Sequence, residues 1–171
     1  GKVITIEGEN ATKTSSQMLY PIQDQSSPSV SPSSPKYLKN NTIGGNSWRL
    51  VGQWIEWDFD VAESGYYNIS LYDCQNYVRG IYVSRKIFID GEVPFKELEA
   101  YGFKYDQTWR NDVLSDDPGN PYMFYFEAGH HTIRMEAVLG DFSDVISQVQ
   151  NCVQQLNAIY REVIKVTGVA P

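Results

Sequence analysis

The spacing of apolar residues along the chain changes once, near Gly140. Before that point apolar and polar residues alternate with a period of two, and turn-forming residues separate the runs. After it, apolar residues recur at intervals of seven, at Phe142, Val149, Leu156 and Val163. The first pattern is typical of half-buried strands and the second of an amphipathic helix. We therefore predict a β domain over residues 1–140 and a connecting helix over residues 141–168.

The clearest strand is predicted over residues 54–61, where Ile55, Trp57, Phe59 and Val61 share one face and mostly acidic residues the other. The same alternation predicts further strands at 3–6, 66–73 and 85–90, and a hairpin of 122–127 with 131–138. Short strands at such intervals, without alternating helices, are typical of two packed antiparallel sheets. We predict a mostly-β fold, an antiparallel jelly-roll β-sandwich with one long C-terminal α-helix.

Residues 10–47 are polar and rich in turn formers, with serine and proline dominating 26–35. Proline removes backbone donors, and serine side chains compete for backbone hydrogen bonds. We therefore predict a long surface loop here, or a partly disordered segment.

The predicted helix of about 25 residues would be about 37 Å long. Its flanking positions are mostly Gln, Asn and Ser, whereas a two-stranded coiled coil favours charged flanks. We expect the apolar stripe to pack on the sandwich or on another domain of the same parent chain. The sequence is thus interpreted as one module of a larger protein, with a further domain downstream of the helix.

The net charge of −7 argues against binding to nucleic acid or to an anionic membrane surface. Insertion into a membrane is not expected either, because no stretch approaches the roughly 20 apolar residues of a membrane span. The two cysteines, Cys74 and Cys152, show no metal-ligand spacing. We expect two buried free thiols, and a disulfide between them stays open as the alternative.

Nothing in the sequence indicates catalysis. His130 and His131 are adjacent in a predicted strand, so their side chains point to opposite faces, and we expect one to be packed and one solvated. Sequence motifs for a nucleophile elbow, a zinc protease, a phosphate loop and a dinucleotide site are missing. No pair of carboxylates is singled out as a glycosidase pair. We predict that the chain is not an enzyme.

A metal site is suggested at the start of the chain. Glu7 and Glu9 flank Gly8 after a predicted strand, so both carboxylates would lie on one side and could share a hard cation such as calcium. Asp141 is a candidate third ligand from the far end of the β domain. The alternative is two solvated acids at a sheet edge.

Aromatic residues outside the core pattern form the third signal, because flat rings stack on the C–H faces of sugars while amide and guanidinium groups bind hydroxyls. The candidate ligand-binding residues are Trp48, Asn76, Tyr77, Tyr82, Arg85 and Trp109. The alternative is that these rings anchor long loops to the sandwich.

Several short motifs resemble galactose-binding-like β-sandwiches of the carbohydrate-binding-module type. These motifs are residues 6–9, 52–57, 65–67, 89–91 and 128–133. A second set is similar to the accessory domain of large extracellular solute-binding proteins of bacterial sugar ABC transporters: residues 41–45, 75–76, 89–95 and 156–168. Together the motifs span nearly the whole chain, including the helix.

The resemblance implies an extracellular, non-catalytic module that binds an oligo- or polysaccharide, in a parent protein that is a cell-surface lipoprotein. In glycan-binding relatives of this sandwich a Glu-x-Glu near the start helps to hold a structural calcium, which corresponds to Glu7 and Glu9. This sequence departs from that pattern at its end, where the helix replaces the final strand with the remaining acidic ligand. A structural or docking domain without a glycan ligand is the alternative function.

Overall fold

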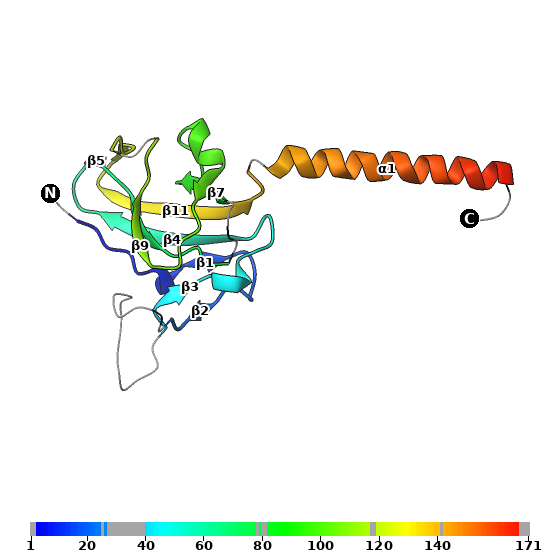
Figure 1. The fold of residues 1–171 in the computed structure, drawn as a ribbon. Helices are drawn as coiled ribbons and strands as arrows, with labels where there is room; N and C mark the ends of the chain where they lie inside the picture. Colours follow the sequence, from blue (N-terminus) through cyan, green and yellow to red (C-terminus); the bar gives the residue numbers. More distant parts are fainter. Residues whose placement is uncertain are drawn as a thin grey trace. The chain divides into compact units, whose positions relative to one another are not determined.

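The chain divides into two units, Gly1–Val138 and Leu139–Pro171. The first unit is built from β-strands and short 3₁₀ helices, and the second contains one α-helix (Figure 1). The computed structural model describes residues 3–24, 26, 40–77, 79, 82–116, 119–140 and 142–167. Asp141 and most of the Ser-Pro-rich segment therefore lie outside the described residues. A further domain after the helix stays a prediction.

The larger sheet of the first unit has five antiparallel strands in the order β1-β4-β11-β7-β8. Their bounds are β1 (Lys13–Thr14), β4 (Trp54–Val61), β11 (Gly129–Val138), β7 (Val83–Ile89) and β8 (Tyr101–Phe103). The longest pair, β4 and β11, lies side by side in Figure 1, with Val61 opposite Gly129 and Trp54 opposite Glu136.

The remaining strands form three short antiparallel ladders. These are β2 (Pro21–Ile22) with β3 (Thr42–Ile43), β5 (Gly65–Tyr67) with β10 (Phe124–Phe126), and β6 (Ser70–Asp73) with β9 (Arg110–Val113). Leu114 connects the last two ladders, because its N–H donates to Ile69 O (2.9 Å) and its carbonyl accepts from Tyr122 N (2.8 Å). We call β5, β6, β9 and β10 together the second layer.

The hydrophobic core lies between the larger sheet and the second layer. Alternation along β4 buries Ile55, Trp57 and Val61, as predicted, and Ile87 of β7 is fully buried. The second layer contributes Leu114, Phe124 and Phe126, and the rings of Phe59 and Phe126 meet edge to face at 5.5 Å. The predicted antiparallel β-sandwich with one C-terminal helix is confirmed.

One residue on the predicted solvent face of β4 is buried instead. The Glu56 side chain is only 6% exposed, and it accepts hydrogen bonds from Lys13 Nζ (3.0 Å) and Arg134 Nε (2.8 Å). Burial alone would raise the pKa of Glu56, but these two hydrogen bonds outweigh it and lower the pKa. Sequence alternation did not predict the burial of Glu56, because Lys13 lies in strand β1, which is only two residues long.

The predicted hairpin of 122–127 with 131–138 is wrong. Strand β10 pairs with β5, whereas β11 pairs with β4 and β7, so the chain passes from one layer to the other at Gly129. Gly129 has φ +146°, a conformation that side chains rarely adopt. The chain does turn at Gly129, as predicted, but the turn leads from one layer to the other instead of joining two paired strands.

The N-terminal predictions also need correction. Residues 3–6 form no strand, and the described part of 10–47 carries β1, β2 and β3 instead of one continuous loop. The 3₁₀ helices are η1 (Gly8–Asn10), η2 (Gly45–Ser47) and η3 (Lys96–Glu99).

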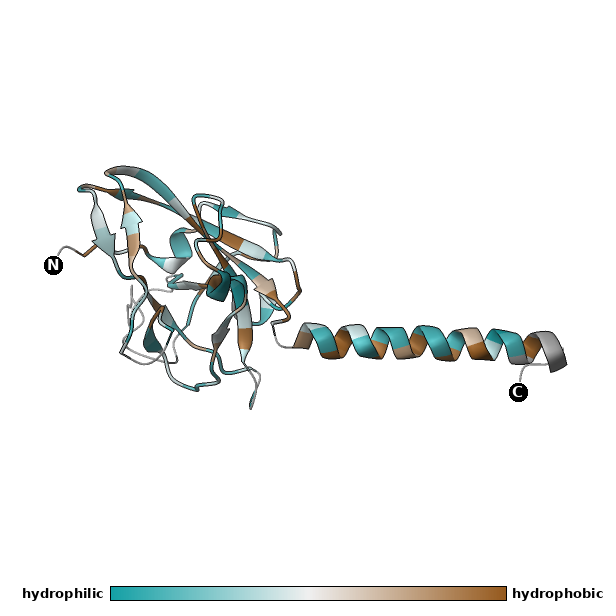
Figure 2. Ribbon diagram, turned by 90° about the horizontal axis from the view of Figure 1, so that it is seen from above, coloured by the Kyte–Doolittle hydropathy of each residue, from teal (hydrophilic) through white to brown (hydrophobic). Residues whose placement is uncertain are grey.

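The predicted helix is present as α1 (Phe142–Thr167). Apolar and polar bands alternate along it in Figure 2. The apolar residues between Phe142 and Tyr160 are mostly exposed within their own unit, with Val149, Leu156 and Ile159 exposed by more than half. Cys152 is exposed in this helix and Cys74 is half-buried, so the prediction of two buried thiols is wrong for Cys152. Both described cysteines are free. Among the described residues, no helix is long and apolar enough to cross a membrane.

Candidate functional site

Trp48 and Arg85 form a packed pair beside the larger sheet. The Arg85 guanidinium carbon lies 4.3 Å from the centre of the Trp48 ring, and Arg85 Nη2 donates to Trp48 O (3.1 Å). The Trp48 indole N–H donates to Gln53 O (3.0 Å). Burial lowers the pKa of Arg85 to about 10, which leaves the guanidinium charged at neutral pH. These contacts indicate that Trp48 and Arg85 anchor a loop to the sandwich, which is the alternative to ligand contact.

Gly44 explains how the Trp48 ring can lie so close to the backbone. It has φ +98°, and a β-carbon placed on it would lie 2.9 Å from Trp48 Cε3. Only glycine fits this combination of backbone conformation and contact distance. The motif at 41–45 therefore has a structural reason, because it seats the ring of Trp48.

The three candidates Asn76, Tyr77 and Tyr82 are exposed side chains in the segment between β6 and β7. The Tyr77 hydroxyl lies 3.6 Å from the β-carbon position of Gly45, and the Tyr82 ring lies 3.0 Å from that of Gly102 in β8. The Tyr82 ring thus packs against Gly102 and the Tyr77 hydroxyl lies near Gly45, while both residues stay more than half exposed. These two tyrosines fit a role in ligand contact better than Trp48 does.

Trp109 directly precedes β9 and stacks on Tyr72 of β6, with ring centroids 5.5 Å apart and planes 29° apart. Its indole N–H lies 3.0 Å from Asp24 Oδ2, 85 residues away in the sequence. Burial alone would raise the pKa of Asp24, but hydrogen bonds from Ser26 and Trp109 outweigh it and lower the pKa. Asp24 therefore stays ionised and holds the Trp109 ring in place.

Asp24 is itself fixed by Asn41. The Asp24 N–H donates to Asn41 Oδ1 (2.7 Å), and Asn41 Nδ2 donates to Asp24 O (2.9 Å). The neighbouring ladder of β2 and β3 leads to Gly45, whose β-carbon position lies 3.2 Å from Ile22 Cδ1. Asp24, which binds Trp109, follows β2, and Gly45, which lies near the Tyr77 hydroxyl, follows β3. Because β2 and β3 pair, Trp109 and Tyr77 lie in neighbouring loops.

A cluster of charges lies beneath this region, at the end of the β6–β9 ladder. Arg110 pairs with Asp112 (2.7 Å) and Asp106 (3.6 Å), and Asp73 lies opposite Arg110 in the ladder. Within the described part of the chain, no hydrogen bond reaches the buried Asp73 Oδ1. Burial, and secondarily the charge of Asp112, raises the pKa of Asp73 to about 7, although Arg110 opposes the shift.

The carboxylates proposed for calcium are not arranged as predicted. Gly8 and Glu9 lie in the 3₁₀ helix η1 and Glu7 is its N-cap, so strand alternation does not align them. Glu9 Oε2 is buried without a hydrogen-bond partner among the described residues, which suits a cation ligand. The described residues nevertheless contain no cluster of three acidic, histidine or cysteine side chains that could hold a metal, and Asp141 lies outside them. The fit to calcium is therefore incomplete, and the site stays a prediction.

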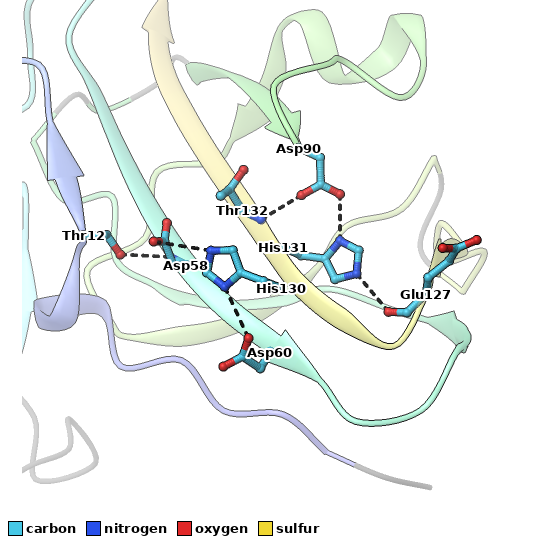
Figure 3. Close-up of polar contacts among 8 residues, drawn as sticks. All are labelled: Thr12, Asp58, Asp60, Asp90, Glu127, His130, His131 and Thr132. Atoms are coloured by element: carbon cyan, nitrogen blue, oxygen red, sulfur yellow. Dashed lines mark hydrogen bonds and ion pairs between the residues drawn. The ribbon is translucent and has the colours of Figure 1, made fainter.

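The two histidines are separated as predicted (Figure 3). The His130 side chain is 60% exposed and lies between Asp58 (3.6 Å) and Asp60 (3.2 Å). His131 packs against Phe59 and Phe126, and its ring nitrogens contact Asp90 Oδ2 (2.7 Å) and Glu127 O (2.9 Å).

The contacts of His131 serve a turn of the backbone. Asp90 has φ +51° and also accepts from Thr132 N–H (2.8 Å), so His131 and Thr132 together hold a strained turn. The hydrogen bond with Asp90 raises the pKa of His131, and burial opposes that shift. The geometry gives His131 a structural role.

Solved structures with a similar fold include a glucanotransferase and a mannanase. Eleven chains match. One is the Paenibacillus sp. cycloisomaltooligosaccharide glucanotransferase, complexed with cycloisomaltoheptaose, with TM-score 0.54, 17% identity, and coverage of 77% of this chain and 15% of that chain. Another is the Podospora anserina GH26-CBM35 β-(1,4)-mannanase, with TM-score 0.53, 13% identity, and coverage of 80% and 24%.

A family 35 carbohydrate binding module from Clostridium thermocellum also matches, with TM-score 0.43, 20% identity, and coverage of 56% of this chain and 66% of that module. That score is too low to support an argument. No protein-family model matches the chain, and no curated protein matches it in sequence. The first two likenesses show the fold, and the chain spans only 15% and 24% of the length of those two proteins.

Proposed function

We propose that the β-sandwich is a non-catalytic module that binds an oligo- or polysaccharide. Its fold is similar to part of a glucanotransferase that was solved with a cyclic oligosaccharide and to part of a mannanase whose name includes a carbohydrate-binding module. The fold alone does not specify a ligand, so the proposal depends on the side chains that the sandwich presents.

The observation that carries the proposal is the stacked pair of Trp109 and Tyr72. The indole N–H of Trp109 is tied to Asp24, and Asp24 is tied to Asn41, so the rings are fixed before any ligand arrives. A pre-ordered aromatic surface loses little conformational entropy when a sugar stacks on it. Exposed Asn76 and Tyr77 in a neighbouring loop add hydrogen-bonding groups of the kind that hydroxyl-rich ligands require.

Binding to a glycan microarray, followed by calorimetric titration with each positive glycan, tests the proposal. We expect Trp109→Ala to weaken glycan binding by at least about tenfold, because truncating an aromatic hot spot of an interface removes more than about 1 kcal/mol. The matched control is Trp109→Phe, which keeps a smaller ring for stacking and loses the N–H donor, so it should weaken binding less than alanine does.

Two results would contradict this proposal. One is a folded wild-type protein that binds no oligo- or polysaccharide on the array. The other is a Trp109→Ala variant that keeps its thermal midpoint and binds as the wild type does. Trp48→Ala is not a suitable probe, because the contacts of Trp48 stabilise the fold.

We further propose that the module belongs to an extracellular solute-binding protein of a bacterial sugar transporter, anchored to the cell surface as a lipoprotein. The motifs at 41–45, 75–76 and 89–95 support this context, together with the helix that follows the sandwich. In that setting the module would hold a glycan near the transporter while other domains of the parent chain bind the transported sugar.

A docking domain without its own ligand is the second candidate function, and the apolar stripe of α1 favours it. Phe142, Val149, Leu156 and Ile159 are exposed within their unit, as expected for a face that another domain covers. If docking is the function, limited proteolysis of the full-length parent protein should leave α1 uncut. Ready release of an intact sandwich by cleavage within α1 would contradict tight docking.

A further inference from the structure

The outward face of the second layer carries aromatic residues at both of its ends. Along the segment 65–73, Tyr66, Asn68, Ser70 and Tyr72 are exposed, while the residues between them pack toward the core. We call the outward side chains of β5, β6, β9 and β10, together with Asn68, Trp109 and Met123 beside them, the tyrosine face. Alternation places the outward residues of each strand on one side of it, and the pairing of β5 with β10 and of β6 with β9 sets outward residues opposite each other on the same face.

Each end of the tyrosine face carries a pair of neighbouring aromatic rings, edge to face at one end and stacked at the other. At one end Tyr66 lies opposite Tyr125, with ring centroids 5.3 Å apart. At the other end Tyr72 stacks on Trp109, with ring centroids 5.5 Å apart. The Tyr66 and Tyr125 side chains are 69% and 57% exposed, although burying such rings would ordinarily stabilise a protein. Large exposed rings of this kind mark interaction sites.

Among the described residues, the surface between the two ring pairs carries no charged side chain, and it combines polar groups with the exposed apolar side chains of Val113 and Met123. Asn68, Ser70 and Asn111 present amide and hydroxyl groups there. Asn68 is oriented by its own contacts, since its Nδ2 donates to Tyr122 O (2.8 Å) and lies 3.2 Å from Met123 Sδ. Side-chain amides and hydroxyls can each donate and accept hydrogen bonds, which suits a ligand rich in hydroxyl groups.

Charge on the second layer is confined to its inner side. Asp73, Arg110 and Asp112 alternate with the outward residues, and Arg110 pairs with Asp112. Among the described residues, the outward positions of β5, β6, β9 and β10 carry no charged side chain. In a chain of net charge −7 this neutral strip matches an uncharged ligand better than an anionic one.

The separation of the ring pairs indicates the size of the ligand. Tyr66 and Tyr72 are six residues apart in an extended segment, which corresponds to about 20 Å. One sugar unit cannot contact both pairs, whereas a linear chain of several units can lie across the intervening amides.

We propose that the tyrosine face binds a linear, uncharged polysaccharide chain, with Tyr66–Tyr125 and Tyr72–Trp109 as its two stacking positions. This inference rests on the proposed function and extends it, because it names the ligand class and adds a second stacking position at Tyr66 and Tyr125. A chain that bridges both positions binds more tightly than a short fragment that occupies only one.

The test is calorimetric titration of the whole 171-residue protein with β-1,4-mannan, β-1,4-glucan and α-1,6-glucan oligosaccharides from two to eight sugar units. Wild-type affinity for at least one neutral series should rise with length. The double variant Tyr66→Ala/Tyr125→Ala should bind the longest member about tenfold more weakly. It should bind the disaccharide as the wild type does. Tyr20→Ala, which removes an equally exposed ring from outside the face, is the matched control and should bind normally.

The outcomes separate the two proposals. If the wild type binds no glycan at all, the proposed function fails and this inference fails with it. If the wild type binds and the double variant retains full affinity for the longest ligand, only this inference is overturned, as it is if charged uronic-acid oligosaccharides bind more tightly than neutral ones. Should the double variant not fold, Tyr66→Ala and Tyr66→Phe replace it, and loss of affinity for the longest ligand in the alanine variant alone supports the inference.

Discussion

Replacing Trp48 with alanine is expected to lower the free energy of unfolding by about 3 kcal/mol, the lower end of the range for large aromatic truncations, because the ring is only partly buried. The indole ring contacts Gly44 and lies under the Arg85 guanidinium, and its N–H donates to Gln53 O. Removing it opens a cavity and leaves the desolvated charge of Arg85 without its aromatic neighbour. Chemical denaturation followed by intrinsic fluorescence and circular dichroism measures the change.

Trp48→Phe provides the control for this prediction. Phenylalanine keeps a smaller ring beneath Arg85 and loses the indole hydrogen bond, so its cost should be about 1–2 kcal/mol, below that of alanine. A Trp48→Ala protein that unfolds at the wild-type denaturant concentration would show that Trp48 is a surface residue, and would restore it as a candidate for ligand contact.

The sequence predicted those parts of the fold that depend on local periodicity. The alternation in 54–61 identified β4 and most of its buried face, because a strand that packs on one side must alternate. The spacing of seven residues between apolar positions predicted both ends of α1 to within one residue. Neither prediction required knowledge of a distant partner.

Strand partners could not be predicted in the same way. The turn at Gly129 appeared to join two paired strands, yet Phe126 of β10 lies opposite Gly65 and His131 of β11 lies opposite Phe59. The residues near Gly129 show that the chain turns there. Which layer each strand joins depends instead on how β10 and β11 pack in the shared core, and the local sequence does not show this. Burial of Glu56 has the same origin, because Lys13 and Arg134 reach it from distant segments.

The sequence predicted which residues belong to the candidate site, but not which of them contact a ligand and which anchor a loop. Loop position did not distinguish Trp48, which anchors its loop against Arg85, from Tyr77 and Tyr82, which stay exposed. Trp109 is hydrogen-bonded to Asp24, which lies 85 positions away in the sequence, so no local pattern could predict this contact. Tyr66 and Tyr72 were visible in the alternation of 66–73, but their importance follows only from the rings opposite them in Tyr125 and Trp109.

The same strand that carries Tyr72 outward carries Asp73 inward, and this carboxyl gives the second large expected effect. Its pKa is raised to about 7 in the folded protein, first by burial and then by Asp112. In the unfolded chain an aspartate titrates near 3.9. Between these two values the folded state binds more protons than the unfolded state, so stability falls as pH rises from about 4 to about 7.

Replacing Asp73 with asparagine should remove this loss, because the amide keeps the shape of the carboxyl without its charge. At pH 8 we expect Asp73→Asn to be more stable than the wild type by about 2 kcal/mol, well below the full linkage value because the Asp73 side chain is only partly buried. Near pH 4 the two proteins should be similar. Denaturant titrations at pH 4, 6 and 8 measure the difference, with Asp116→Asn, an exposed aspartate in the loop after β9, as a control that should stay within about 0.5 kcal/mol of the wild type. An Asp73→Asn protein that is less stable at pH 8 would mean that the ionised carboxylate is stabilised by Arg110, and the assignment of a protonated buried acid beneath the tyrosine face would be wrong.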